Sequence, residues 1–252
     1  MDALTAGQFS LVYNAISFGV AAFAAATLFF WFGRSQVNHH YKTTLTISGL
    51  VTFIALYHYW RIFGSWTGSY EVVNGVVTAT GAEFNRAYRY VDWLLTVPLL
   101  LIELILVMRL SQAETVSRSV TLGGAAALMI LLGYPGEVSA GIDSTRLLFG
   151  ALSMVPFLYI VFSLYSSLGE AIERQPESVR GLVRLARTLT VVAWFFYPVV
   201  YFLPFVFRMN GGMTIAVIEV GYTVADVTAK AVFGLLIYAI AVRKSEAEGL
   251  QA

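Results

Sequence analysis

An Asp and a Lys lie four residues apart in the middle of a stretch that is otherwise apolar enough to cross a lipid bilayer. The stretch runs from about Met213 to Val242, and the charged pair is Asp226 and Lys230. An ionisable side chain at the centre of a membrane helix costs roughly 2.5 to 3.5 kcal/mol, so it usually has a function and a partner. The spacing puts both groups on one helix face, about 6 Å apart along the axis. They form either a functional site or an ion pair that holds helices together.

The composition is typical of an integral membrane protein. Hydrophobic residues make up 58% of the 252-residue chain and charged residues only 12%, against roughly 25% in soluble domains. We therefore expect the lipid bilayer as a partner, and the net charge of +1 argues for no nucleic acid partner. Cysteine is absent, which excludes disulfides, thiolate metal sites and thiol nucleophiles. No metal site is expected.

Polar breaks divide the chain into seven apolar runs, each long enough for a transmembrane helix. We expect one domain over residues 1–252, an all-α membrane protein built as a seven-transmembrane-helix bundle, with the first helix retained and not cleaved as a signal peptide. The predicted helices are 8–33, 41–64, 84–108, 118–135, 143–168, 179–208 and 213–242. In the link between the second and third helices, Asn74-Gly75 between β-branched pairs predicts a small β-hairpin with a type I′ turn.

The distribution of Lys and Arg predicts the orientation of the bundle. Ten of these residues lie near the helix ends on the C-terminal side of the membrane and five near the opposite ends. The positive-inside rule then places the N-terminus and the hairpin outside and the C-terminus inside. We expect a multi-pass protein of the cell membrane, specifically a bacterial inner membrane.

The predicted helix 84–108 carries a second set of intramembrane polar groups: Arg89, Asp92, Thr96 and Glu103. From Asp92 to Glu103 is eleven residues, almost three turns, so both carboxyls lie on one face about 16 Å apart. A series of titratable groups across a membrane is typical of a proton relay. The alternative for Glu103 is a hydrogen bond that packs helices together.

Three motifs on different helices together resemble the microbial (type 1) rhodopsins, most closely the proteorhodopsin and xanthorhodopsin group. They are Arg89-Tyr-Val-Asp-Trp-Leu-Leu-Thr-Val-Pro98, Trp194-Phe-Phe-Tyr-Pro-Val-Val-Tyr201 and Asp226-Val-Thr-Ala-Lys230. The resemblance covers all seven predicted helices. It implies a light-driven outward proton pump, an ion transporter and not an enzyme.

The resemblance implies a role for each charged residue of the two helices. Lys230 would bind all-trans retinal as a protonated Schiff base. Asp92 would be its counterion and proton acceptor, with Asp226 as second counterion. Glu103 would donate the proton that restores the nitrogen, from the inner side. Arg89 would neutralise the carboxylate pair.

The remaining expected site residues also follow from the resemblance. His58 stands where this group pairs a histidine with the acceptor aspartate, and Thr96 flanks the carboxyl face. Tyr197 would hydrogen-bond to Asp226, and Leu100 stands where an apolar residue accompanies green absorption. The expected retinal pocket consists of Trp93, Leu100, Met129, Gly133, Ser153, Phe157, Trp194, Tyr197, Pro198 and Tyr201. For the aromatic members, ordinary core packing is the alternative.

Gly150 implies a second cofactor. Many rhodopsins have Trp at the matching position, whereas xanthorhodopsin-like members have Gly and bind a carotenoid antenna there. A gap in a lipid-facing wall would admit a flat conjugated ring. The alternative is that Gly150 only allows close helix packing. The resemblance also implies a homo-oligomer, a trimer or pentamer.

Other functions remain as alternatives. Inward chloride pumps of this family have a neutral residue in place of Asp92, and sodium pumps have Asn, Asp and Gln at the positions of Asp92, Thr96 and Glu103. A photosensory rhodopsin that signals through a partner is the main alternative, although a carboxyl donor favours pumping. A seven-helix transporter or receptor without retinal is another. The candidates for proton release on the outer side are Glu83, Glu137 and Glu219.

Overall fold

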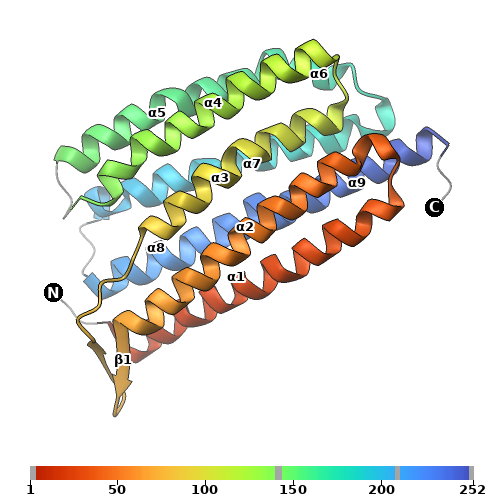
Figure 1. Ribbon diagram of the computed structural model, residues 1–252. Helices are drawn as coiled ribbons and strands as arrows, with labels where there is room; N and C mark the ends of the chain where they lie inside the picture. Colours follow the sequence, from red (N-terminus) through yellow and green to blue (C-terminus); the bar gives the residue numbers. More distant parts are fainter. Residues whose placement is uncertain (1–3, 140–143, 208–210, 250–252) are drawn as a thin grey trace.

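The computed structural model of the chain describes residues 4–139, 144–207 and 211–249. Long helices run side by side, with the N-terminus and the β-hairpin at one end of the bundle and the C-terminus at the other (Figure 1). The helical elements are α1 (Ala6–Gly33), η1 (Arg34–Gln36), α2 (His39–Ser69), α3 (Ala87–Met108), α4 (Gln112–Glu137), α5 (Ser144–Tyr165), α6 (Ser167–Glu173), α7 (Glu177–Phe207), α8 (Gly211–Asp226), η2 (Val227–Val232) and α9 (Phe233–Ala247). Counting α5 with α6, and α8 with η2 and α9, these form the seven helices that the sequence predicts.

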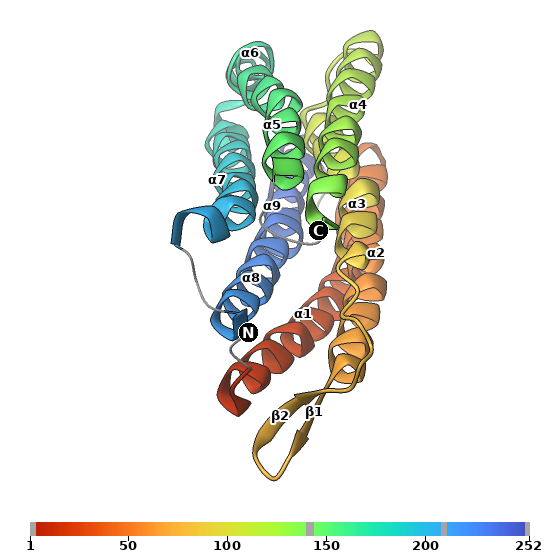
Figure 2. The ribbon, with the colours of Figure 1, turned by 90° about the vertical axis from the view of Figure 1, so that its left-hand side faces the viewer.

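The helices form a closed ring. Each packs against its neighbour in sequence from α1 to α5, α7 packs against α5, α8 and α9, and α8 returns to α1. Figure 2 shows the ring from one end, with α8 beside α1 and α7 beside α5. The ring turns the inner faces of α3, α7 and the last helix toward a common interior.

The outer surface of the bundle is apolar. Six helical segments of the described chain are long and apolar enough to cross a membrane: Ala6–Gln36, Ala87–Met108, Gln112–Glu137, Ser144–Glu173, Glu177–Leu203 and Gly211–Ala247. The seventh helix, α2, is not among them, because Thr, Ser, His and Tyr residues dilute its apolar face. Large side chains such as Phe32 and Phe162 are 74% and 70% exposed, and so wide an apolar surface needs lipid around it. The chain is a multi-pass membrane protein.

The predicted hairpin is confirmed. Strands β1 (Tyr70–Val73) and β2 (Val76–Ala79) pair antiparallel, with Val73 opposite Val76. Asn74 and Gly75 both have positive φ, 52° and 80°, as a type I′ turn requires, and Asn and Gly tolerate that conformation.

Capping residues extend some helices beyond the predicted apolar runs. The fourth helix begins at Gln112, where the Ser111 side chain accepts a hydrogen bond from the Glu114 N–H, and not at 118. The sequence prediction was late because the first turns are polar, whereas an N-cap only has to satisfy free backbone N–H groups. Residues 143 and 208, at predicted helix ends, lie outside the described residues.

The sequence predicted one continuous helix over residues 213–242, but the structure interrupts this helix. Residues Val227–Val232 form a π-helix, and the Phe233 N–H donates to the carbonyl of Thr228, five residues earlier. Single π turns inside α-helices are rare and often occur at functional sites. This segment contains Lys230.

Candidate functional site

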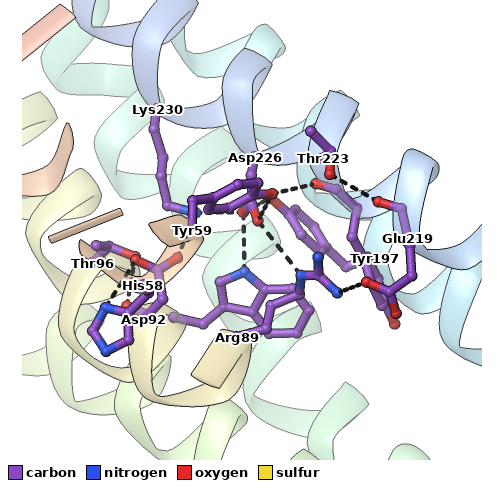
Figure 3. A network of polar contacts seen from close by, with 12 residues as sticks. His58, Tyr59, Arg89, Asp92, Thr96, Tyr197, Glu219, Thr223, Asp226 and Lys230 are labelled. Carbon is purple, nitrogen blue, oxygen red and sulfur yellow. Dashed lines mark hydrogen bonds and ion pairs between the residues drawn. The ribbon is translucent and has the colours of Figure 1, made fainter. Parts of the chain in front are cut away.

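The centre of the ring holds a lysine between two aspartates (Figure 3). Lys230 extends from the π segment and is 2% exposed, while Asp92 on α3 and Asp226 at the end of α8 are fully buried. The Lys230 Nζ donates a hydrogen bond to Asp226 Oδ1 and lies 3.0 Å from Asp92 Oδ2. The structure thus brings together the three residues that the motifs single out.

Asp226 is held by hydrogen bonds from three other helices. Tyr59 on α2 donates to Oδ2 at 2.8 Å, Trp93 on α3 donates to Oδ1 at 3.0 Å, and Tyr197 on α7 donates to Oδ1 at 2.8 Å. Hydrogen bonds to an ionised acceptor are stronger than those between neutral groups. Asp226 is therefore held in place as an anion by hydrogen bonds from protein side chains. The sequence interpretation missed Tyr59, although it directly follows His58 in a Tyr-His-Tyr run.

Asp92 has fewer partners. Neither carboxylate oxygen has a hydrogen-bond donor in the described chain, although Lys230 lies at ion-pair distance. The Nδ1 atom of His58 lies 3.9 Å from Asp92 Oδ1 and 2.9 Å from the carbonyl of Ile54, so the expected histidine is adjacent but not hydrogen-bonded to the aspartate. Thr96 donates to the Asp92 backbone carbonyl at 2.8 Å and not to its side chain.

A second buried ion pair lies between this centre and the hairpin end of the bundle. Arg89 donates to Glu219 Oε2 at 2.7 Å, and its Nε lies 4.0 Å from Asp226 Oδ2. Arg89 and Glu219 are 3% and 1% exposed. The Arg89 Nη1 atom makes the hydrogen bond to Glu219, whereas Nε and Nη2 lack hydrogen-bond partners within the described residues. Such buried donors are normally satisfied by water.

Glu103 lies on the opposite side of the centre, toward the C-terminal end of the bundle. It is 1% exposed, and its Oε2 accepts a 2.6 Å hydrogen bond from Ser48 on α2. The polar partner of Glu103 was not predicted, because one Ser in a helix with many hydroxyl residues gives no signal.

One apolar cavity adjoins Lys230. It holds about 740 Å³ of empty space, part of it open to the outside. All twelve residues expected at the cofactor line it: Trp93, Leu100, Met129, Gly133, Gly150, Ser153, Phe157, Trp194, Tyr197, Pro198, Tyr201 and Lys230. Seven lining residues were not predicted: Tyr90, Val97, Ile130, Met154, Phe202, Tyr222 and Ala229. The buried amine of Lys230 lines this apolar cavity, and a lysine amine can form a Schiff base with a carbonyl compound.

Gly150 lies against two aromatic rings of α7 at one wall of this cavity. A Cβ atom there would be 2.6 Å from Tyr201 Cε1 and 2.7 Å from Phe202 Cζ. Both distances are shorter than van der Waals contact. The absence of a side chain at position 150 is therefore required by the way these two rings pack.

A buried ion pair fixes Tyr201. Arg146 on α5 donates to Glu137 Oε2 at 3.0 Å and to the Tyr201 carbonyl at 3.3 Å, while the Tyr201 hydroxyl donates to the Arg146 carbonyl at 2.9 Å. Arg146 and Glu137 are 6% and 5% exposed. Of the three carboxylates considered for proton release, Glu137 and Glu219 are thus buried in ion pairs, whereas Glu83 is exposed in the link before α3.

The chain matches one family over most of its length. The family model described as "Bacteriorhodopsin-like protein" matches residues 12–244. A relative named "Green-light absorbing proteorhodopsin", from Gamma-proteobacterium EBAC31A08, is 32% identical over 240 residues, which cover 92% of this chain and 88% of the relative.

Solved structures of similar proteins have the same fold. The crystal structure of xanthorhodopsin, described as a light-driven ion pump with dual chromophore, is 49% identical, covers both chains completely and superposes with a TM-score of 0.94. A thermophilic rhodopsin is 43% identical over 99% of this chain and 100% of its own, with a TM-score of 0.93.

Proposed function

The chain belongs to the bacteriorhodopsin-like family, as a microbial rhodopsin of the proteorhodopsin and xanthorhodopsin type, and from this premise we propose that it is a light-driven outward proton pump. The observation that carries the proposal is the position of two buried carboxyls on α3. Asp92 lies 3.0 Å from the Lys230 nitrogen, and Glu103 lies eleven residues further along the same helix. A pump needs its proton acceptor and donor in reach of the nitrogen from different sides.

Retinal is the proposed cofactor. Lys230 would hold it through a Schiff base linkage, and the apolar cavity would hold its chain and ring. When bound there, retinal supplies absorption of visible light and a double-bond isomerisation that changes the direction and proton affinity of the nitrogen. Trp93, Trp194 and Tyr197 line the cavity, and their large, rigid rings would restrict the movement of the retinal chain.

Asp92 is the proposed proton acceptor. It faces the Lys230 nitrogen and lacks hydrogen-bond donors of its own, so taking up a proton breaks no hydrogen bond. Protonation of Asp226 would weaken the hydrogen bonds that it accepts from three side chains. We therefore assign Asp226 the role of a counterion that stays ionised. His58, 3.9 Å away, would share the charge on Asp92.

Glu103 is the proposed donor, with Ser48 holding its carboxyl in place. On the other side of Lys230, Arg89 and Glu219 lie between Asp226 and the hairpin end of the bundle. We propose that this end faces outward, in agreement with the distribution of Lys and Arg, and that the Arg89–Glu219 pair lies on the exit route. The C-terminal end would then face the inside of a bacterial inner membrane.

The proposal is tested by the pH of an unbuffered suspension of cells that express the chain and receive retinal. Illumination should acidify the medium, and a protonophore should abolish the change. Acidification that persists or grows with the protonophore would mean that another ion is pumped and protons follow passively. A photosensory protein would show photochemistry in the purified state but no steady pH change.

We also propose that a carotenoid binds at Gly150 as a light-harvesting antenna. Support comes from the xanthorhodopsin structure, whose description includes a dual chromophore. The rings of Tyr201 and Phe202 fill the space beside Gly150, so they would have to move to admit a carotenoid ring. With a hydroxylated carotenoid added, the action spectrum of pumping should gain a carotenoid band that disappears in Gly150→Trp. A spectrum with the retinal band alone would leave Gly150 as a packing residue. The oligomer is proposed to be a trimer or pentamer.

A further inference from the structure

We propose that protons reach Glu103 along a row of hydroxyl groups on α2, formed by Tyr41, Thr44 and Ser48, and that Glu248 collects them at the C-terminal end of the bundle. This inference rests on the proposed pump function and describes the uptake side of the same site. It assigns a role to the end of the chain, beyond the last predicted helix.

The row is defined by helical spacing and burial. Positions 41, 44 and 48 are three and four residues apart, which places them on one face of α2. All three residues are almost completely buried, with exposures of 0%, 1% and 1%. The same part of the bundle is otherwise filled by an apolar cluster that includes Leu45 and Leu104, so the hydroxyl groups are a polar exception within it.

The end of the row nearest Lys230 has unsatisfied polar atoms. Ser48 Oγ donates to Glu103 Oε2 at 2.6 Å and lies 3.3 Å from the Thr44 carbonyl. The hydroxyl of Thr44 and the Oε1 atom of Glu103 have no hydrogen-bond partner among the described residues. Leaving a buried polar atom unpaired costs about 1 to 3 kcal/mol, so such atoms usually bind water. One of them belongs to Glu103 on α3 and the other to Thr44 on α2, between Ser48 and Tyr41, and together they mark a path that water can complete between Glu103 and Tyr41.

The other end of the row reaches a partly exposed carboxylate. The Tyr41 hydroxyl donates to Glu248 Oε1 at 2.6 Å, and Arg109 donates to the same atom at 2.7 Å. Asn38 donates to Oε2 at 3.2 Å. The Glu248 side chain is 31% exposed and borders a cavity at this end of the bundle, which Lys244 also lines. Solvent protons can therefore reach this carboxylate directly.

The charges around Glu248 suit a group that takes up a proton and passes it on. Burial alone would raise the pKa of Glu248, but hydrogen bonds from Tyr41 and Arg109 outweigh it, and the pKa is lowered. His40 on α2 adds a weaker effect in the same direction, and Lys244 on α9 is the other charged group that faces it. Glu248 is thus ionised at neutral pH and does not retain the proton it collects.

The test measures how fast the pigment recovers after a flash, in purified protein with retinal. Thr44→Val removes a hydroxyl at nearly constant volume and should slow reprotonation through Glu103 roughly tenfold, equivalent to about 1.4 kcal/mol in the barrier. The matched control is Thr46→Val on the same helix, because the Thr46 hydroxyl only donates to the Lys42 carbonyl. Thr46→Val should recover at the rate of the unmodified chain. Thr44→Ser keeps the hydroxyl group and should also recover at that rate, unlike Thr44→Val.

The collecting group is tested by Glu248→Gln against Glu246→Gln, since Glu246 is exposed and outside the row. In Glu248→Gln the recovery rate should fall about tenfold per unit rise in pH, because direct capture of protons from solution becomes limiting. Glu246→Gln should follow the unmodified chain. Unchanged recovery in both Glu248→Gln and Thr44→Val overturns the inference, and so does equal slowing in Thr44→Val and Thr46→Val.

The same preparations separate this inference from the pump function. If the unmodified chain acidifies its medium in light but the variants recover normally, only the uptake row is wrong. If the unmodified chain shows no light-driven acidification, the proposed function is wrong. An infrared measurement of the Glu103 carboxyl band gives a second readout that does not depend on turnover, and Ser48→Ala should shift that band in the dark.

Discussion

Asp92 and Asp226 both face Lys230, yet three neutral side chains donate hydrogen bonds to Asp226 and none donates to the side chain of Asp92. This difference gives two chemically identical groups different roles. A carboxylate with three donors is stabilised as an anion, while a carboxylate without them depends on the nearby cation alone.

Replacement of Asp92 by Asn tests this assignment. We expect a pigment that absorbs at longer wavelength and does not pump, because a negative counterion stabilises the cationic ground state more than the excited state. Visible spectra and light-induced pH changes in cells measure the two effects. An Asp92→Asn protein that still acidifies its medium contradicts the acceptor role.

Loss of the Lys230 amine should abolish colour. Lys230→Ala removes the proposed attachment point, so no visible band should form when retinal is added to the folded protein. Lys244→Met is the matched control, since Lys244 is also buried but binds the carbonyls of Val107 and Met108. It should form the pigment normally. A coloured Lys230→Ala protein with a stable linkage would rule out this attachment.

The donor role predicts a selective kinetic effect in Glu103→Gln. The protein should still release a proton after a flash, but recover more slowly by at least about a hundredfold, the lower limit for loss of a positioned acid. Its recovery should also depend on pH, because the proton must then come from solution. Time-resolved absorption measures both. Recovery identical to that of the unmodified chain would leave Glu103 as a packing residue.

Packing around Gly150 predicts a cost for even the smallest side chain. In Gly150→Ala the added Cβ would meet the rings of Tyr201 and Phe202 at 2.6 and 2.7 Å, and overpacking of this kind costs about 1 to 3 kcal/mol. In Gly124→Ala on α4 no neighbouring atom lies within 4 Å of the new Cβ, so stability should rise by about 0.5 to 1 kcal/mol. Thermal bleaching of the two pigments compares them, and equal midpoints would contradict the close contact.

The lowered pKa of Glu248 predicts a pH-dependent attachment of the chain end. A carboxylate whose pKa falls on folding stabilises the folded state above its ordinary value of 4.5, and loses that effect as the pH drops through the lower value. The end of α9 should therefore loosen in acid. The chain lacks cysteine, so one spin label at Glu246→Cys reports mobility without background. Mobility that is independent of pH, or identical in Glu248→Gln, would mean that the carboxylate does not hold this end.

The sequence alone predicted the parts of the site that depend on local spacing. Asp226 and Lys230 share a helix face because they are four residues apart, and the hairpin forms because Asn74-Gly75 accepts positive φ. The family resemblance then predicted twelve residues at the cofactor, all of which line the cavity. Trp93, Trp194, Tyr197, Pro198, Tyr201 and Lys230 lie in the three motifs, and the other six follow from the resemblance of the helices between them.

Contacts between distant helices could not be predicted in this way. The hydrogen bond from Tyr59 to Asp226 joins residues 167 positions apart, and that from Ser48 to Glu103 joins residues 55 apart. Their partners depend on how the ring closes, and the chain offers many Tyr, Ser and Thr residues of equal local character. The π segment was missed for a related reason, because its apolar pattern is nearly that of an α-helix.

The π segment also limits how this chain can change in length. An α-helix advances about 100° per residue, and a π turn accommodates one extra residue without a loop. Deleting one residue of this segment after Lys230 would let the helix return to regular geometry with α9 in nearly its present orientation, because the π turn absorbs that residue. A single insertion or deletion within α9 would instead rotate everything after it by about 100°. Lys244, which now binds the last carbonyls of α3, would then point elsewhere. Homologues should therefore tolerate the loss of one residue in the π segment better than in α9, as long as Lys230 is kept.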